Sequence, residues 1–205
     1  MQRNDVGSAN LAGVDAALRL LIKRWRTMVE HTDWSTDHDC AWWYGERASV
    51  SQLAGAAWRM RGWAMQEYSW QRANDDESKS YARIDLAVEC KKPHLRFICE
   101  AKQLHPWMNA DPCDDIDDAF KRLETQLDNI ERDGWDRVAA VFVSPRLKSL
   151  DGYAAALKPF TRALSRVRAA CVWTFPWWAR RNALRYDVTE TFYPGAALLI
   201  RHSQR

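Results

Sequence analysis

Three charged residues in the segment YARIDLAVECKKPHLRFICEAKQ, residues 81–103, have the types and spacing that metal-dependent chemistry needs. Asp85 lies in a run that alternates apolar and polar residues, and Glu100 and Lys102 lie two residues apart in a second such run. Alternation with a period of two is typical of a strand with one buried face. Glu100 and Lys102 should therefore project from the same face of their strand.

The turn between the two runs predicts an antiparallel hairpin. If residues 91–94, KKPH, form the turn, Cys90 lies opposite Leu95 and Asp85 lies opposite Glu100. Opposed side chains on neighbouring strands have Cβ atoms about 5 Å apart, so two carboxylates placed there repel one another unless a proton or a cation lies between them. A divalent metal is the simplest cation that would resolve the repulsion.

The order Asp85, a turn, and then Glu100, Ala101 and Lys102 at the end of an apolar strand resembles the signature of the PD-(D/E)XK nuclease superfamily. In that signature an Asp is followed by (D/E)-x-K on the neighbouring strand. The match is partial, because Ile84 stands where the name-giving Pro would be.

The resemblance covers about residues 41–145 and implies an α/β fold. Its restriction-endonuclease-like core has the element order αβββαβ, with a central mixed sheet flanked by helices. We expect a single domain over residues 1–205, in which a helix at 8–30 and the elements of 146–205 are additions to the core. Periodicity predicts helices over residues 46–61 and 116–132, strands over 63–72, 137–144 and 170–175, and a further helix after residue 146.

Two further acids are candidates for the same site. The resemblance implies that Glu46, on the first core helix, joins the metal, and its spacing from the apolar stripe places it along the buried face. A salt bridge to Arg47 or Arg83, or a helix that begins one turn later at residues 49–52, remains an equal alternative. Glu67 is the weaker candidate, since a glutamate beside arginines on a strand is more often part of an ion pair.

The helix predicted at 116–132 is preceded and begun by the acidic run of residues 111–118. We interpret these acids as helix-capping and dipole-stabilising residues in preference to a second cation site. Gln126 resembles a helix glutamine that some members of the superfamily use near the phosphate, but an exposed glutamine is usually only solvated.

Aromatic and basic residues alternate after residue 176, and this segment is the best candidate for a nucleic-acid surface. Trp177 could stack on a base, while Arg180, Arg181 and Arg185, together with Lys102, could contact phosphates. The alternative is tryptophan packed in the core with arginines extending outward.

The composition is compatible with this interpretation without requiring it. A net charge of +3 permits a nucleic-acid partner, and the five cysteines form no C-x-x-C pair. No signal peptide or membrane-spanning run is evident, so we expect a soluble cytoplasmic protein with no membrane partner. The oligomeric state is left open, with a homodimer among the alternatives.

Together these features predict a metal-dependent nuclease that hydrolyses phosphodiester bonds of nucleic acid, with DNA favoured. Asp85, Glu100 and the carbonyl of Ala101 would bind Mg²⁺ or Mn²⁺, Glu46 would complete a second metal position, and Lys102 would act on the attacking water and the phosphate. One alternative is a catalytically inactive domain of the same fold that binds nucleic acid or protein. Another is an unrelated α/β protein in which Glu100 and Lys102 form a surface ion pair.

Overall fold

The computed structural model describes residues 4–31, 40–71, 81–130, 134–176, 179, 185–186 and 191–203, which form an α/β fold. The helices are α1 (Ala16–His31), α2 (Glu46–Arg59), α3 (Cys113–Asp128) and α4 (Tyr153–Arg166). The strands are β1 (Asp5–Ala9), β2 (Trp63–Gln71), β3 (Tyr81–Lys91), β4 (His94–Leu104), β5 (Asp136–Val143), β6 (Ala170–Phe175), β7 (Arg185–Tyr186), β8 (Thr191–Phe192) and β9 (Ala196–Ser203).

Seven of these strands form one mixed sheet in the order β1-β6-β9-β5-β4-β3-β2, and β7 and β8 pair separately. β4 and β5 are parallel and are joined through α3, whereas the other neighbouring strands of the sheet are antiparallel. A parallel pair needs such a crossover connection. The α/β class and the central mixed sheet flanked by helices are thereby confirmed.

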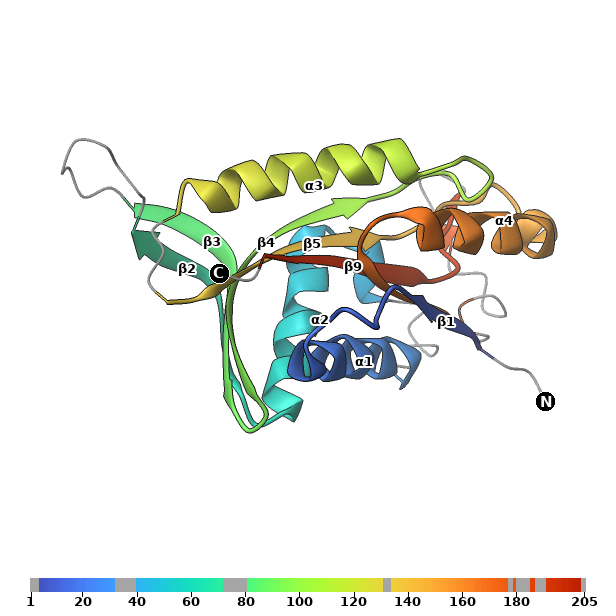
Figure 1. Cartoon of the computed structure of the whole chain (residues 1–205). Helices are drawn as coiled ribbons and strands as arrows, with labels where there is room; N and C mark the ends of the chain where they lie inside the picture. The colour runs from blue at the N-terminus through green and yellow to red at the C-terminus, as the bar shows by residue number, and fades with distance from the viewer. Residues whose placement is uncertain are drawn as a thin grey trace.

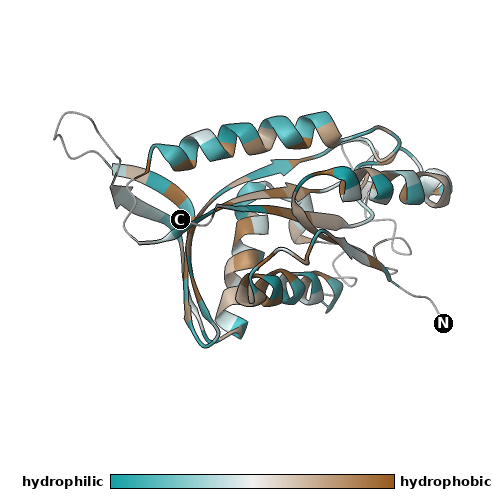
Figure 2. Cartoon of the chain, in the orientation of Figure 1, coloured by the Kyte–Doolittle hydropathy of each residue, from teal (hydrophilic) through white to brown (hydrophobic). Residues whose placement is uncertain are grey.

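The helices cover both faces of the sheet, with α1 and α2 on one face and α3 and α4 on the other (Figure 1). Residues of β5 show how one strand serves both layers: Val138, Ala140 and Phe142 pack under α1 and α2, while Ala139 and Val141 pack under α3 and α4. β5 is therefore covered on both faces, as its continuous apolar run predicts. Hydrophilic and hydrophobic residues alternate along α3 and α4 (Figure 2), and the buried residues of both helices are almost all apolar.

From α2 to β5 the chain follows the predicted order of a helix, three strands, a helix and a strand. α2 ends at Arg59, two residues before the predicted end, and the Gly62 amide donates to the carbonyl of Ala57 just beyond its last turn. A Cβ atom at Gly62 would lie 2.2 Å from the Cys90 sulfur, so glycine also lets the chain pass close to β3. α3 begins at Cys113, a turn earlier than the predicted residue 116.

The two ends of the chain differ from the prediction. The N-terminal helix begins at Ala16 instead of residue 8, because Asp15 accepts hydrogen bonds from the amides of Ala17 and Leu18 and caps it there. Residues 5–9 form the edge strand β1, and the C-terminal strand β9 lies inside the sheet between β5 and β6. None of the helices in the described ranges is long and apolar enough to cross a membrane.

Candidate functional site

The hairpin of β3 and β4 has the predicted register from the turn to Leu86, the residue that follows Asp85 in the sequence. Cys90 pairs with Leu95, and the ladder continues to Leu86 opposite Cys99, where it ends. Extending this register by one residue puts Asp85 opposite Glu100. The observed ladder stops one pair short of these two acids, but their carboxyl groups interact directly, so the predicted proximity of Asp85 and Glu100 agrees with the structure.

β3 is distorted at the same point, on the side that faces β2. The β2–β3 ladder omits Glu67 and Asp85, and Glu67 has a φ of 53°, in the left-handed region that residues other than glycine rarely adopt. Ile84 packs in the core under α3, whereas Leu86, two residues later, packs under α1 and α2. The side-chain alternation of β3 therefore shifts at Asp85, and the strand turns away from β4 beyond it.

Carboxylates occupy the edge of β4 that β3 leaves unpaired. The amide of Ala101 donates to Oδ2 of Asp85 at 2.7 Å, and the amide of Gln103 donates to Oε2 of Glu46 at 3.2 Å. The N–H and C=O of a strand residue point toward the same neighbour, so the carbonyl of Ala101 also faces the side of Asp85. The break in the ladder thus brings carboxylate and carbonyl oxygens together.

Glu100 is buried, with 8% of its surface exposed, and its carboxyl group is in hydrogen-bonding contact with that of Asp85. Burial, followed by the charge of Asp85, raises the pKa of Glu100 to about 8. Burial and the charge of Glu46 also raise the pKa of Asp85, against the lowering effect of its hydrogen bond from Ala101. Without a cation, the two carboxyl groups therefore retain a shared proton at neutral pH.

Glu46 is the first residue of α2, which excludes the alternative of a helix that begins one turn later. Its carboxylate lies 3.5 Å from Nζ of Lys102, so its ion pair is with Lys102 instead of Arg47 or Arg83. Both of those arginines pair at 3.2 Å with Glu67, which is thereby an ion-paired residue as the sequence favours. Lys102 is 57% exposed, and its ammonium group is accessible to a bound molecule.

These residues line a cleft of about 530 Å³ between α3 and the β3–β4 edge, which we call the carboxylate cleft. Sequence reasoning did not find two of its basic residues, Arg83 and Arg122. Arg122 shares a face of α3 with Asp118 and Gln126, at a spacing of four residues beside the buried stripe, and this spacing was the available signal. The cleft is lined by Glu46, Arg83, Asp85, Glu100, Ala101, Lys102, Leu104, Asp115, Asp118, Ala119, Arg122, Leu123 and Gln126.

Gln103 is a second residue that the sequence did not identify. It is buried on the opposite face of β4 from Glu100, where its side chain accepts from Ser49 Oγ at 3.0 Å and donates to the carbonyl of Trp42 at 2.9 Å and to Ser144 Oγ at 3.3 Å. These contacts join β4 to α2, to the segment before α2 and to the end of β5. Gln103 therefore fixes the strand that carries Glu100 and Lys102.

No group of three or more His, Cys, Asp or Glu side chains in the described part of the chain is arranged to hold a metal ion. The ligand atoms that Asp85, Glu100 and Ala101 offer nevertheless suit a hard divalent cation, because all of them are oxygens. The two positive charges of such a cation would also offset the repulsion between the carboxylates of Asp85 and Glu100. Mg²⁺ is usually bound by one or two carboxylates, with water and substrate phosphate completing its coordination. Two carboxylates and a carbonyl are enough for that mode of binding.

The predicted nucleic-acid segment lies largely outside the described residues, which exclude Trp177, Arg180 and Arg181. Arg185 is described only as part of the backbone of β7, where it pairs with Phe192. The prediction for this segment stays a prediction. Comparison of the chain with protein-family models, with curated proteins and with solved structures found no match.

Proposed function

We propose that the protein is a divalent-metal-dependent nuclease with a restriction-endonuclease-like core, acting on phosphodiester bonds of nucleic acid and preferentially of DNA. The observation that carries the proposal is the contact between the half-buried Asp85 and the buried Glu100 at the end of the β3–β4 ladder. Lys102 lies on the same face of β4 two residues from Glu100, and the elements around the pair follow the order αβββαβ. This combination is what the resemblance to PD-(D/E)XK nucleases implies.

Asp85, Glu100 and the carbonyl of Ala101 would hold Mg²⁺ or Mn²⁺, and Glu46 would contribute to a second position. When bound, the metal would polarise the scissile phosphate and lower the pKa of water. The protein's own contribution is to hold the oxygen ligands in place, through the backbone hydrogen bonds of Ala101 and Gln103.

Lys102 has the position and exposure to act on the reacting groups. Its ammonium group can donate hydrogen bonds to the attacking water and can offset charge that develops on the phosphate. Arg122, on the opposite wall of the cleft, contributes a second positive charge toward the same substrate. Lys102 and Arg122 therefore offset part of the negative charge of the cleft, which the metal would otherwise have to neutralise alone.

The proposal is tested by incubating the full chain with circular and linear DNA, with Mg²⁺, with Mn²⁺ and with a chelator. We expect cleavage only with metal, and its loss in Glu100→Gln. Glu89→Gln is the matched control. Glu89 lies on β3 of the same hairpin, opposite Arg96 in the β3–β4 ladder, and it does not line the cleft. DNA that is bound but remains intact with both metals would instead favour the inactive binding domain.

A further inference from the structure

One segment of the chain has a clear excess of basic over acidic residues. Residues 144–168 contain six of the lysines and arginines and a single acid, Asp151, so this segment has a formal charge of +5 in a chain whose total is +3. Three of the six, Lys158, Arg162 and Arg166, are four residues apart on α4 and are exposed. Residues at this spacing project from one side of a helix.

That side of α4 lines a cavity of about 730 Å³, which we call the α4 groove. The opposite wall is the connection between β4 and α3, represented by residues 108–111. Met108, Ala156 and Ala163 are buried and provide an apolar floor, while Lys158 and Arg162 stand on the rim. The groove therefore combines an apolar base with positive edges.

The positive charge of the groove is largely uncompensated by the acids nearby. Among the residues that the structure describes, Arg166 pairs with Asp111, whereas neither Lys158 nor Arg162 has a carboxylate within ion-pair distance. No acid of α3 is among the described residues that line the groove, and several of these acids contact cations outside it.

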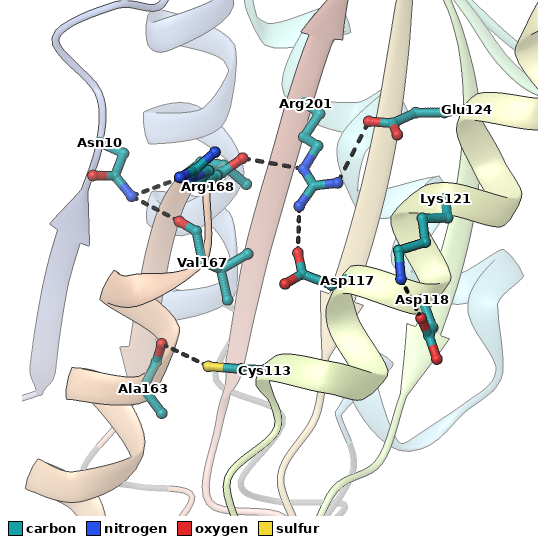
Figure 3. Close-up of polar contacts among 11 residues, drawn as sticks. Asn10, Cys113, Asp117, Asp118, Lys121, Glu124, Ala163, Val167, Arg168 and Arg201 are labelled. Atoms are coloured by element: carbon teal, nitrogen blue, oxygen red, sulfur yellow. Dashed lines mark hydrogen bonds and ion pairs between the residues drawn. The ribbon is translucent and has the colours of Figure 1, made fainter.

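Figure 3 shows how the α3 acids are engaged. Arg201 of β9 contacts Asp117 and Glu124, and Lys121 contacts Asp118 at 2.8 Å. Asp117, Asp118 and Glu124 are thus compensated by these cations, and Lys158 and Arg162 remain available to an anionic partner.

The α4 groove and the carboxylate cleft lie on either side of one connection. Leu104 and Asp115 line the cleft, and residues 108–111 between them line the groove. We propose that the α4 groove binds the phosphate backbone of a nucleic acid next to the bond held in the cleft. This inference rests on the proposed function, and it adds a binding surface separate from the residues that would perform the chemistry.

The groove should bind without regard to base sequence. Lysine and arginine side chains on an exposed helix contact phosphates, which carry no sequence information. Asn109 supplies the only side-chain amide in the described lining of the groove, too little for reading base edges. Affinity should therefore depend strongly on salt and weakly on sequence.

The test measures binding of the full chain to a fluorescently labelled 20-base-pair duplex in a chelator, where no cleavage occurs, over a range of NaCl concentrations. In Lys158→Ala/Arg162→Ala we expect the slope of log K against log[NaCl] to fall by about two, or roughly 0.9 for each lost phosphate contact. Affinity at low salt should fall by at least about tenfold. Lys23→Ala/Arg24→Ala is the matched control, because these residues are exposed on α1 across the sheet and should leave both values unchanged.

Each other outcome has a definite meaning. An unchanged salt slope in the α4 variant, with its melting temperature maintained, would overturn the proposal. Polyglutamate of equal charge that competes as strongly as the duplex would assign the groove to an acidic protein and also overturn it. If the α4 variant loses the expected slope but the wild-type chain cleaves no DNA with metal, the groove assignment stands and only the nuclease activity is rejected.

Discussion

The carboxylate cleft and the α4 groove both concentrate charge, but they do so by different means. The cleft is assembled from α2, β3, β4 and α3, and its acids at the β3–β4 break, Asp85 and Glu100, are partly or largely removed from water. The groove draws its positive charge from the repeat of a single helix, and its cations are exposed. Burial strengthens charge interactions in the first region, whereas water and salt weaken them in the second.

This difference predicts how each region responds to substitution. Removing one charged group from the cleft should have a large effect on activity or stability, because the groups that interact with it are partly shielded from water and lose a strong interaction. Removing one cation from the groove should have a small effect that adds to the next. The predictions below compare the two regions, from the largest expected effect to the smallest.

Glu100→Gln should reduce metal-dependent cleavage on the order of a thousandfold, since it removes a charged ligand at nearly constant shape. The salt slope of duplex binding in a chelator should stay at the wild-type value, because the α4 groove is untouched. Cleavage rates and binding isotherms of the same preparation check both. Wild-type cleavage by this variant would remove Glu100 from the site.

The stability of the metal-free protein should fall as the pH rises from about 5 to 8. The folded chain holds a proton on Glu100, with its pKa near 8, that the unfolded chain releases near its ordinary pKa of 4.5. The stabilisation is therefore complete below pH 4.5 and is lost toward pH 8, at up to about 1.4 kcal/mol per pH unit.

Urea unfolding at several pH values measures this slope. In Glu100→Gln the slope should flatten, while in Lys158→Ala/Arg162→Ala it should match the wild type. Mg²⁺ at a hundredfold excess over Kd should add about 2.7 kcal/mol at a pH where the acids ionise. A metal-free slope that Glu100→Gln leaves unchanged would mean that the two acids do not share a proton.

Gln103→Ala should destabilise the fold by about 1–3 kcal/mol, because it removes the buried hydrogen bonds that Gln103 makes with Ser49, Ser144 and the carbonyl of Trp42. Cleavage should also fall, since Glu100 and Lys102 lie on the strand that Gln103 fixes. Gln66→Ala is the control, because Gln66 has a single exposed contact with Ser51 and its loss should cost less than about 0.5 kcal/mol. Equal losses of stability in the two variants would contradict the role given to Gln103.

Lys102→Met should lower turnover by about tenfold while leaving the metal-induced rise in melting temperature largely intact. The reason is that Lys102 is exposed and contacts Glu46, and it is not a ligand in the proposed metal site. Turnover and thermal shift, measured together, separate these effects. Full turnover in this variant would assign Lys102 to the ion pair alone.

Local patterns predicted the hairpin well. A short turn fixes the register of the strands on either side, so Cys90 opposite Leu95 followed from the sequence, and with it the meeting of Asp85 and Glu100. The termination of α2 near Gly62 was equally local. These features depend on residues close together in the chain.

Features that depend on distant residues were not predicted. The alternation of β3 placed Ile84 and Leu86 on one face, but the left-handed backbone at Glu67 on the neighbouring strand accompanies a shift between faces. The place of β9 inside the sheet depends on β5 and β6, which precede it by many residues. Arg122 joined the cleft only because α3 packs over the β4 edge.

The hydrogen bonds from Ala101 and Gln103 to carboxylates have a consequence for how the site forms. Their acceptors, Asp85 and Glu46, are held by main-chain amides of a strand inside the sheet. The oxygen ligands are therefore preorganised: the entropy of ordering them is lost once, when the chain folds, and not again when a cation binds. Binding should then require no slow rearrangement of these ligands, and at neutral pH its main cost is the release of the proton that the empty pair holds.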